Sequence, residues 1–244
     1  MTAQTSAKEF SRRHKILEQQ GSRLKADLRD FILGWQDGLV NNLGLILGVA
    51  IATNERRVVL ISGIALLFAE SISMAAVAFT SQNAVRDYYQ RMVEQEKREM
   101  REVPEKERDE IREIYQEKGF SGKELESIVK KITSDEKVWL DTMMAEEIRL
   151  FPEETRPLES AAVVGLSAVI GSAIPLLPFF VLPVKAAIPV TLLLSAGFLF
   201  LVGMAKARLT VGDGWKSGIQ MLVIGLASAL IGYLIGVILG AQTF

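Results

Sequence analysis

Two acidic side chains occur inside stretches of the chain that are otherwise almost free of charge. Asp37 lies in the apolar stretch 31–53, and Glu70 lies in the apolar stretch 58–80. If these stretches cross a bilayer, an ionisable group at the centre of each costs roughly 2.5–3.5 kcal/mol on insertion scales. A spanning segment keeps such a residue when another interaction offsets that cost. A bound cation would do so, and a structural polar contact between two helices is the alternative.

Helical spacing groups further side chains with these two carboxylates. Asp37 and Asn41 are four residues apart and share a helical face, and Asp30 lies two turns before Asp37. Met74 follows Glu70 by one turn. Two facing helices would therefore offer carboxylates, an amide and a thioether, a set that suits a divalent cation such as Fe²⁺ or Mn²⁺. Taken alone, Met74 would more simply be a residue of the apolar core.

Carboxylates also recur at helical spacing in the charged segment 86–159. The candidate metal ligands there are two Glu-x-x-Glu pairs and part of a Met-Met-Ala-Glu-Glu run: Glu99, Glu102, Glu110, Glu113, Met143, Met144 and Glu147. Each pair places two carboxylates on one helical face. A turn at Pro104 would fold the two helices back on each other, so that the pairs meet. Lys and Arg are interleaved throughout, so a solvated charged surface is the alternative interpretation.

The composition argues against several other kinds of chemistry. The chain has no cysteine among its 244 residues, which excludes disulfides and thiolate metal sites. Its single histidine, His14, lies in the N-terminal arm, where we interpret it as a solvated residue, and the Glu-x-x-His ligand pairs of di-iron carboxylate proteins are missing. We find no nucleophile–base pair, phosphate loop or redox-cofactor motif. The sequence therefore predicts no enzyme, no tightly bound cofactor and no nucleic-acid partner.

Five long apolar stretches predict an all-α integral membrane protein. About 20 helical residues cross a bilayer core of about 30 Å, and each of these stretches is long enough: 31–53, 58–81, 158–180, 184–205 and 215–240. A large soluble helical core is a poor alternative, because long apolar runs without amphipathic alternation are rare in soluble folds. We expect a Pro-rich turn at Pro175, Pro178 and Pro183 between the third and fourth spans.

The alternation of charged and apolar segments predicts four parts. They are a cytoplasmic N-terminal amphipathic arm (1–30), transmembrane helices one and two (31–82), a cytoplasmic carboxylate-rich insert of three helices (83–156), and transmembrane helices three to five (157–242). Basic residues favour the cytoplasmic side of a membrane. They are concentrated in the arm and before the last span, whereas the opposite side offers only Arg56, Arg57 and Lys185. The N-terminus and the insert should therefore be cytoplasmic and the C-terminus outside.

Local signals mark the helices of the insert and the packing of the spans. Gly119 fits the end of a helix, and Ser121 with Glu124 has the spacing of a capping box that begins the next one. In the spans, glycines recur every four residues in three places: Gly34/Gly38, Gly44/Gly48 and Gly232/Gly236/Gly240. This spacing usually means close packing of helices, within one subunit or across a dimer.

Several of these segments together resemble the vacuolar iron transporter family. The segments are Asp-Gly-Leu-Val-Asn at 37–41, Ser-Met-Ala-Ala at 73–76, the run from Arg98 to Ile111, Ile114-Tyr-Gln-Glu-Lys-Gly-Phe, Trp139-Leu-Asp-Thr-Met-Met, Ala205-Lys-Ala-Arg-Leu-Thr and Gly218-Ile-Gln-Met-Leu-Val-Ile-Gly. The resemblance covers about residues 28–242. Each piece is a weak signal, and the combination is specific.

The resemblance implies a homodimer of five-span subunits in a lipid bilayer. It implies that Fe²⁺, and often Mn²⁺, leaves the cytoplasm in exchange for protons, along a path at the dimer interface that spans one and two line. Carried over by position, the path residues are Asp37 and Met74, with Asp30 at the cytoplasmic mouth. It also implies that the insert collects metal through the glutamates and methionines given above. The membrane would be the plasma membrane in a prokaryote and the vacuolar membrane in a eukaryote.

The chain departs from the family pattern at one position. Many members carry Gly-Glu-Tyr after Ser-Met-Ala-Ala, whereas this chain has Val77, Ala78 and Phe79, so the glutamate is missing at Ala78. We hypothesise that Glu70, about two turns earlier, supplies the lost charge. A membrane-anchored metal-binding or sensing protein without transport is the alternative function. In that case the spans would only anchor and dimerise the chain, and intramembrane carboxylates would have no purpose.

Overall fold

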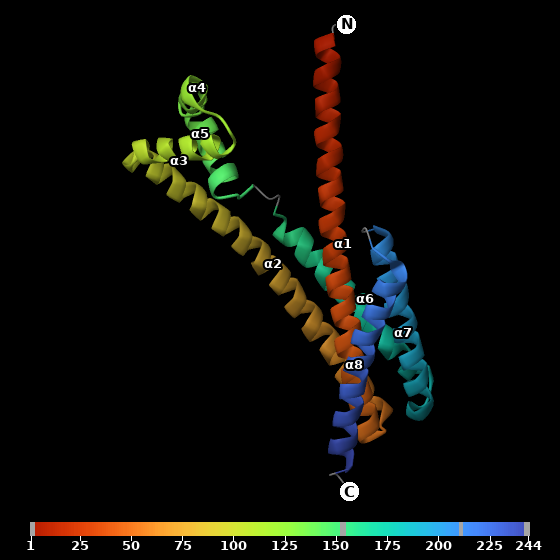
Figure 1. Ribbon diagram of the computed structural model, residues 1–244. Helices are drawn as coiled ribbons and strands as arrows, with labels where there is room; N and C mark the ends of the chain where they lie inside the picture. The colour runs from red at the N-terminus through yellow and green to blue at the C-terminus, as the bar shows by residue number, and fades with distance from the viewer. Residues whose placement is uncertain (1–2, 152–154, 210–211, 242–244) are drawn as a thin grey trace. The chain divides into compact units, whose positions relative to one another are not determined.

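Every regular element in the described part of the chain is a helix. The computed structural model describes residues 3–151, 155–209 and 212–241, and side chains within 23–151, 155–207 and 212–240. In chain order the elements are α1 (Ala3–Thr53), α2 (Arg56–Glu102), α3 (Pro104–Glu117), α4 (Gly122–Ile132), α5 (Glu136–Thr142), a π-helical turn η1 (Met143–Glu147), α6 (Pro157–Val181), α7 (Val184–Leu209) and α8 (Gly214–Ala241) (Figure 1). The predicted all-α class is confirmed, and the side chain of His14 lies outside the described ones.

Four of the described helices are long and apolar enough to cross a membrane. They are α2, α6, α7 and α8, and they contain the second to fifth predicted spans. The first predicted span, 31–53, is the second half of α1, and α1 is not among the four. The stretch includes Gln36, Asp37, Asn41 and Asn42, whose polar side chains lower its mean hydropathy.

The chain divides into two compact units. The apolar unit comprises residues up to Phe79 and from Leu158 onward, and the charged unit comprises Thr80–Pro157. Helix α2 passes from the first unit into the second without a break.

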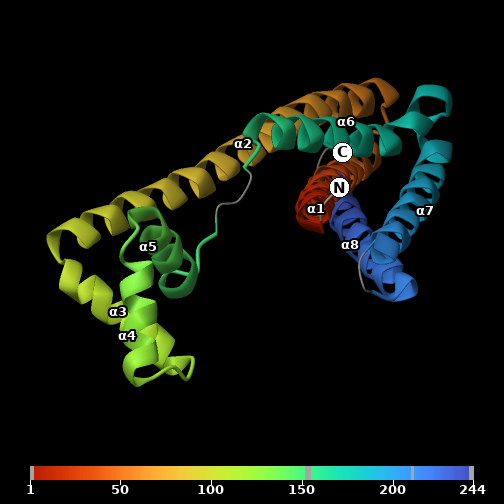
Figure 2. The ribbon, with the colours of Figure 1, turned by 90° about the horizontal axis from the view of Figure 1, so that it is seen from above.

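Glycines allow α1 and α8 of the apolar unit to meet backbone to backbone. A Cβ atom on Gly48 would lie 2.9 Å from the carbonyl oxygen of Gly232, and Cβ atoms on Gly232 and Gly236 would strike the carbonyls of Gly44 and Gly48. The two helices lie side by side in both ribbon views (Figures 1 and 2). The four-residue glycine spacing therefore serves packing within one chain at this crossing.

Helix α6 approaches α1 just as closely. Cβ atoms on Gly34 and Gly38 would strike the carbonyls of Val164 and Ala168, and Gly171 lies against the backbone of Trp35. Small residues thus bring α6 and α8 into direct contact with α1.

The expected Pro-rich turn is shorter than predicted. Pro175 and Pro178 lie inside α6, and only Pro183 falls in the connection to α7. The side chain of Thr191 in α7 donates a hydrogen bond of 3.0 Å to the Pro175 carbonyl. Proline is tolerated in packed apolar helices where neighbours satisfy the backbone groups that it leaves free.

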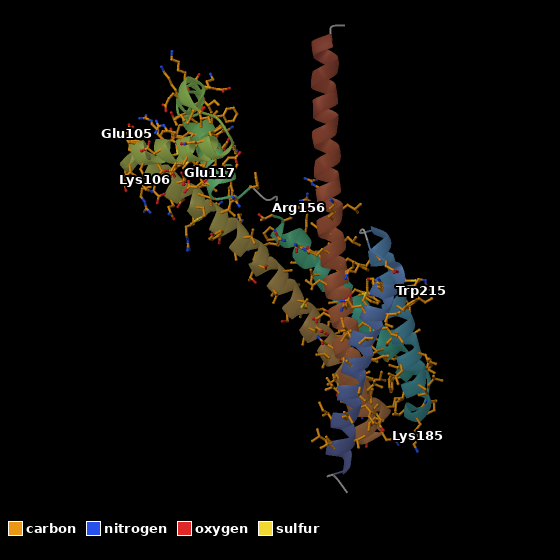
Figure 3. All side chains as sticks on the ribbon, viewed as in Figure 1. Glu105, Lys106, Glu117, Arg156, Lys185 and Trp215 are labelled. Carbon is orange, nitrogen blue, oxygen red and sulfur yellow. The ribbon has the colours of Figure 1, made fainter. Side chains whose placement is uncertain are left out.

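The outer faces of the apolar unit expose large aliphatic side chains. Leu193 of α7 and Leu230 of α8 are 75% and 58% exposed. Lys185, at the start of α7, and Trp215, at the start of α8, lie at opposite ends of this antiparallel pair (Figure 3). Apolar faces between polar ends fit a lipid environment, and the chain is an integral membrane protein.

The helices of the charged unit pack on a small core of their own. Met100, Ile111, Trp139 and Met143 belong to one buried cluster that joins α2, α3, α5 and η1. In Figure 1, α3, α4 and α5 gather near the C-terminal end of α2.

Of the two local signals predicted in this unit, one is confirmed and the other is wrong. Gly119 adopts the expected left-handed conformation, with φ of 98°, after the end of α3. Ser121 stands at the N-terminus of α4, but its side chain makes no capping hydrogen bond, so the predicted capping box is absent. Asp135 instead caps α5, where its carboxylate accepts hydrogen bonds from the backbone N–H groups of Lys137 and Val138.

Candidate metal sites

Five glutamates of the charged unit come together to form what we call the carboxylate cluster. They belong to two groups that share one member: Glu96, Glu99 and Glu107, and then Glu107, Glu110 and Glu147. In each group one oxygen from every carboxylate lies within 4.8 Å of the others. Oxygen ligands lie about 2.0–2.6 Å from a divalent cation. Two ligands on opposite sides of one ion are separated by about twice that distance, which is close to the 4.8 Å limit of each group. Each group is therefore compact enough to hold a divalent cation.

Glu96 and Glu107 form the buried part of the carboxylate cluster. They are only 2% and 1% exposed. If both were ionised, no donor from the described residues would reach Glu96 Oε1 or either oxygen of Glu107. Burial, followed by a hydrogen bond and charge repulsion from Glu107, raises the pKa of Glu96 from its usual 4.5 to about 8. Burial also raises the pKa of Glu107. Without metal, a proton shared by the pair relieves the repulsion.

The remaining members lie nearer to the surface. Partial desolvation, followed by the charges of Glu110 and Glu107, raises the pKa of Glu147 to about 7, although the residue as a whole is exposed. Glu110 accepts an ion pair of 2.8 Å from Lys106, and Glu99 accepts a hydrogen bond of 3.0 Å from Gln95. The cluster is thus buried on one side and open on the other, so an ion can enter it.

The π-helical turn η1 supplies the last ligand of the cluster. The backbone N–H of Ile148 bonds to the carbonyl of Met143 at 3.2 Å, which closes a turn wider than that of an α-helix. Such turns are rare and frequent at functional sites. Met143 and Met144 are both buried, and Met143 is part of the apolar core of the unit.

The structure joins only some of the ligands that the sequence suggested. Glu99, Glu110 and Glu147 fall in the carboxylate cluster, whereas Glu102 and Glu113 are exposed and belong to neither group. Glu96 and Glu107 take their places, one turn before Glu99 on α2 and one turn before Glu110 on α3. The sequence did contain the signal, because Glu96-x-x-Glu99 and Glu107-x-x-Glu110 are Glu-x-x-Glu pairs as well.

A second polar group lies in the apolar unit, and we call it the Glu70 cluster: Asp37, Asn41, Asn42, Glu70 and Ser172. Glu70 is only 8% exposed. Its Oε1 accepts a hydrogen bond of 2.5 Å from the amide of Asn41, and its Oε2 accepts one of 3.3 Å from the hydroxyl of Ser172. The carboxyl group of Asp37 also interacts with it. The cluster thus brings together three of the five predicted path residues, Asp37, Asn41 and Glu70.

The other two predicted path residues lie apart from these contacts. Both carboxylate oxygens of Asp30 are engaged, Oδ1 with Arg29 at 3.0 Å and Oδ2 with the hydroxyl of Ser160. Asp30 is 4% exposed and ties α1 to α6. Met74 is half-buried one turn after Glu70 on α2, and Ala78 is half-buried a further turn along.

Asn42 and Ser172 are members of the Glu70 cluster that sequence reasoning did not single out. The amide of Asn42 donates hydrogen bonds to the backbone carbonyls of Ser172, at 2.8 Å, and Gly63, at 3.3 Å. A serine inside an apolar run gives no sequence signal of its own, because serine is common at helix contacts in membranes.

Both clusters offer oxygen ligands from carboxylates, and the Glu70 cluster adds amides. This donor set favours hard or borderline divalent ions. The fold therefore defines an integral membrane protein with buried carboxylates both within its apolar helices and outside them.

Comparisons with known proteins agree with this class. Vacuolar iron transporter 2 of Oryza sativa subsp. japonica is 34% identical over 205 residues, which cover 83% of each chain. Vacuolar iron transporter 1 of Arabidopsis thaliana is 33% identical over 205 residues, which cover 83% of this chain and 82% of that one. Protein CCC1 of Saccharomyces cerevisiae is 28% identical over 212 residues, which cover 83% of this chain and 66% of the yeast one. The sequence profile of the VIT family matches residues 28–237, and the chain belongs to this family.

Proposed function

We propose that the protein is a secondary transporter that moves Fe²⁺, and Mn²⁺ as a second substrate, out of the cytoplasm in exchange for protons. The observation that carries the proposal is the buried Glu70 carboxylate inside the apolar stretch of α2, with Asp37 and Asn41 beside it. An anchor needs no such group, whereas a path for a divalent cation does. Relatives named vacuolar iron transporters support iron as the cargo.

The proposed topology has five spans. The second half of α1 is the first of them, because it packs against α6 and α8 through glycines and buries Leu39, Leu43 and Ile46 completely or almost so. The N-terminus and the charged unit are cytoplasmic, and the active form is a homodimer. The membrane is the vacuolar membrane in a eukaryote or the plasma membrane in a prokaryote.

In this proposal the carboxylate cluster collects metal on the cytoplasmic side. Two groups that share Glu107 hold ions close to the surface, and the exposed Glu147 is the point of entry. Binding displaces the protons that the raised pKa values of Glu96 and Glu147 retain near neutral pH. Collection is therefore stronger at higher pH. Met143 and Met144 add some preference for softer divalent ions through their thioethers.

Exchange for protons takes place at the Glu70 cluster. A carboxylate buried in the membrane is uncharged when it holds a proton and compensated when it holds a cation, so the two ligands exclude each other. Asp37 and Glu70 together supply two such groups and Asn41 a neutral oxygen. Glu70 thereby replaces the glutamate that many relatives carry at the position of Ala78. Met74 supplies a thioether to the path. At the cytoplasmic end of the path, Asp30 holds α1 to α6 through its hydrogen bond with Ser160.

The decisive experiment is metal flux into proteoliposomes under anaerobic conditions, with Fe²⁺, Mn²⁺, Co²⁺ and Zn²⁺ outside and a pH dye inside. We expect metal uptake with proton movement in the opposite direction. Asp37→Ala and Glu70→Gln should abolish flux while the protein still elutes as a folded dimer. Glu55→Gln, an exposed carboxylate in the turn between α1 and α2, is the matched control and should transport normally.

Two results would count against the proposal. Normal flux in folded Asp37→Ala protein would remove these carboxylates from the path. Metal binding to the purified protein without flux under any pH gradient would favour a membrane-anchored sensor, in which the carboxylate cluster alone is functional.

A further inference from the structure

The amide of Asn42 is unusual because it is completely buried and yet only half satisfied. Its exposure is 0%, and its nitrogen donates to carbonyls of two different helices, Ser172 in α6 and Gly63 in α2. Its oxygen is buried and accepts no hydrogen bond from the described residues. A buried acceptor without a donor is unfavourable, so an apolar residue of the same size would fit this place at lower cost. Stability alone does not account for the asparagine.

Ser172 connects this amide to the Glu70 carboxylate. Its carbonyl receives the Asn42 amide at 2.8 Å, while its hydroxyl donates to Glu70 Oε2 at 3.3 Å. Ser172 is itself completely buried. The hydroxyl reaches this position because α1 has Gly38 opposite it, where a Cβ atom would lie 2.6 Å from Ser172 Oγ. One residue of α6 thus touches both α1 and α2 at polar atoms.

The two adjacent asparagines of α1 therefore have different tasks. They project about 100° apart around the helix, so their side chains reach different groups on the neighbouring helices. Asn41 reaches Glu70 directly at 2.5 Å, and Asn42 reaches the backbones of α2 and α6. A rotation of α1 that broke the Asn42 contacts would carry Asn41 and Asp37 away from Glu70. The contacts of Asn42 fix the angle at which the other two residues meet the carboxylate.

We propose that Asn42 and Ser172 are positioning residues of the transport site, which hold α1, α2 and α6 in the register that presents Glu70 to Asp37 and Asn41. Asn42 sets the rotation of α1, and the Ser172 hydroxyl orients the second oxygen of Glu70. The proposal rests on the proposed function in taking Glu70 as part of the metal path. Hydrogen bonds between helices in membranes contribute little to stability on average, so the expected effect falls on the site more than on the fold.

The test compares three variants of the full chain. Asn42→Leu removes the anchor of α1, and Ser172→Ala removes the hydroxyl but keeps the carbonyl that Asn42 uses. Thr191→Val is the matched control, because Thr191 is also completely buried and also donates to a carbonyl of α6, that of Pro175. Mn²⁺ flux into proteoliposomes gives the half-saturating concentration for each. We expect a rise of about tenfold for Asn42→Leu, a smaller rise for Ser172→Ala, and no change for Thr191→Val.

A second readout does not depend on transport. A membrane-permeant carbodiimide reacts with buried carboxyl groups, and mass spectrometry reports the fraction of Glu70 that is modified. Release of Glu70 should raise this fraction several-fold in Asn42→Leu and Ser172→Ala, and leave it unchanged in Thr191→Val. Labelling and half-saturation that stay at the level of the unmodified chain, with only the yield of folded protein reduced, would show that Asn42 is purely structural. Absence of flux in the unmodified chain would refute the proposed function instead, and the labelling result would still decide the positioning role.

Discussion

Glu107 offers the sharpest test of the carboxylate cluster, because its replacement should change metal affinity and stability in opposite directions. Glu107 belongs to both groups of the cluster, so Glu107→Gln removes one of three carboxylates from each. Loss of an outer-sphere partner already costs about 10–100-fold in metal affinity, and loss of a direct ligand should cost about 100-fold or more. Glu113→Gln on the same helix is the matched control, because Glu113 is exposed and lies outside both groups.

The stability effect follows from the shifted pKa of its neighbour. Raising the pKa of Glu96 from 4.5 to about 8 corresponds to an upper limit of about 5 kcal/mol of unfavourable free energy when the group is ionised. Solvent entry and relaxation reduce this figure, and Glu107 is one of several contributors, so its neutralisation should stabilise the metal-free protein by about 1–2 kcal/mol. The glutamine amide can also donate to Glu96.

Two measurements on the detergent-purified full chain check this reasoning. Titration calorimetry with Mn²⁺ gives the affinity, and thermal unfolding without metal at pH 8 gives the stability, where about 1 kcal/mol shifts the midpoint by about 2–4 °C in a chain of this size. We expect Glu107→Gln to bind weakly and to melt higher, and Glu113→Gln to match the unmodified chain in both. A Glu107→Gln protein that melts lower would refute the charge repulsion on which the argument rests.

Three further predictions follow from the fold and the clusters. The pKa values of Glu96, about 8, and Glu147, about 7, are raised, so the folded state binds more protons than the unfolded state between pH 4.5 and 8. The metal-free protein should therefore lose stability as pH rises through this window. Thermal unfolding at pH 6 and pH 8 would measure this loss. Mn²⁺ affinity in calorimetry should change the other way, rising from pH 6 to pH 8, and a flat profile would contradict the shifted values. Gly232→Ala should abolish folded protein in size-exclusion chromatography because its Cβ would strike the carbonyl of Gly44, whereas Gly197→Ala, with open space around it, should be neutral.

The membrane helices could be predicted closely from the sequence, and the reason is physical. A bilayer imposes one length and one composition on every spanning helix. The ends of α6, α7 and α8 therefore lie within a few residues of the apolar runs, at Pro157–Val181, Val184–Leu209 and Gly214–Ala241. The prolines of α6 escaped prediction because contacts from a neighbouring helix decide whether a proline ends a helix in an apolar environment.

The ligands of the carboxylate cluster could be predicted only as far as the helices that carry them. Glutamates recur every third residue on both helices, at 96, 99 and 102 on α2 and at 107, 110 and 113 on α3. Spacing alone cannot tell which two of the three glutamates on each helix face the partner helix. The turn at Val103 and Pro104 fixes the rotation of α3 against α2. This rotation brings the first two glutamates of each helix into the cluster and leaves the third outside it.

The Glu70 cluster shows the same limit in the membrane. Helical spacing linked Asp37 to Asn41, and composition marked Glu70 as exceptional. Ser172 stands 102 residues after Glu70 in the chain, and no local pattern predicts that a serine of α6 will meet a glutamate of α2. Such partners become visible only once the helices are packed.

The glycine crossing between α1 and α8 has a mechanical consequence. Where two backbones touch with no side chain between them, neither helix can slide or rotate without a steric clash. The two helices therefore move as one rigid body. Alternating exposure of a site to the two sides of a membrane requires some helices to move against others. Asp37 and Asn41 lie on α1 and should therefore stay fixed relative to α8. The helix that moves should be α2, which carries Glu70. Spin labels on α1 and α8 should then keep one separation throughout the transport cycle, whereas labels on α1 and the first half of α2 should report two.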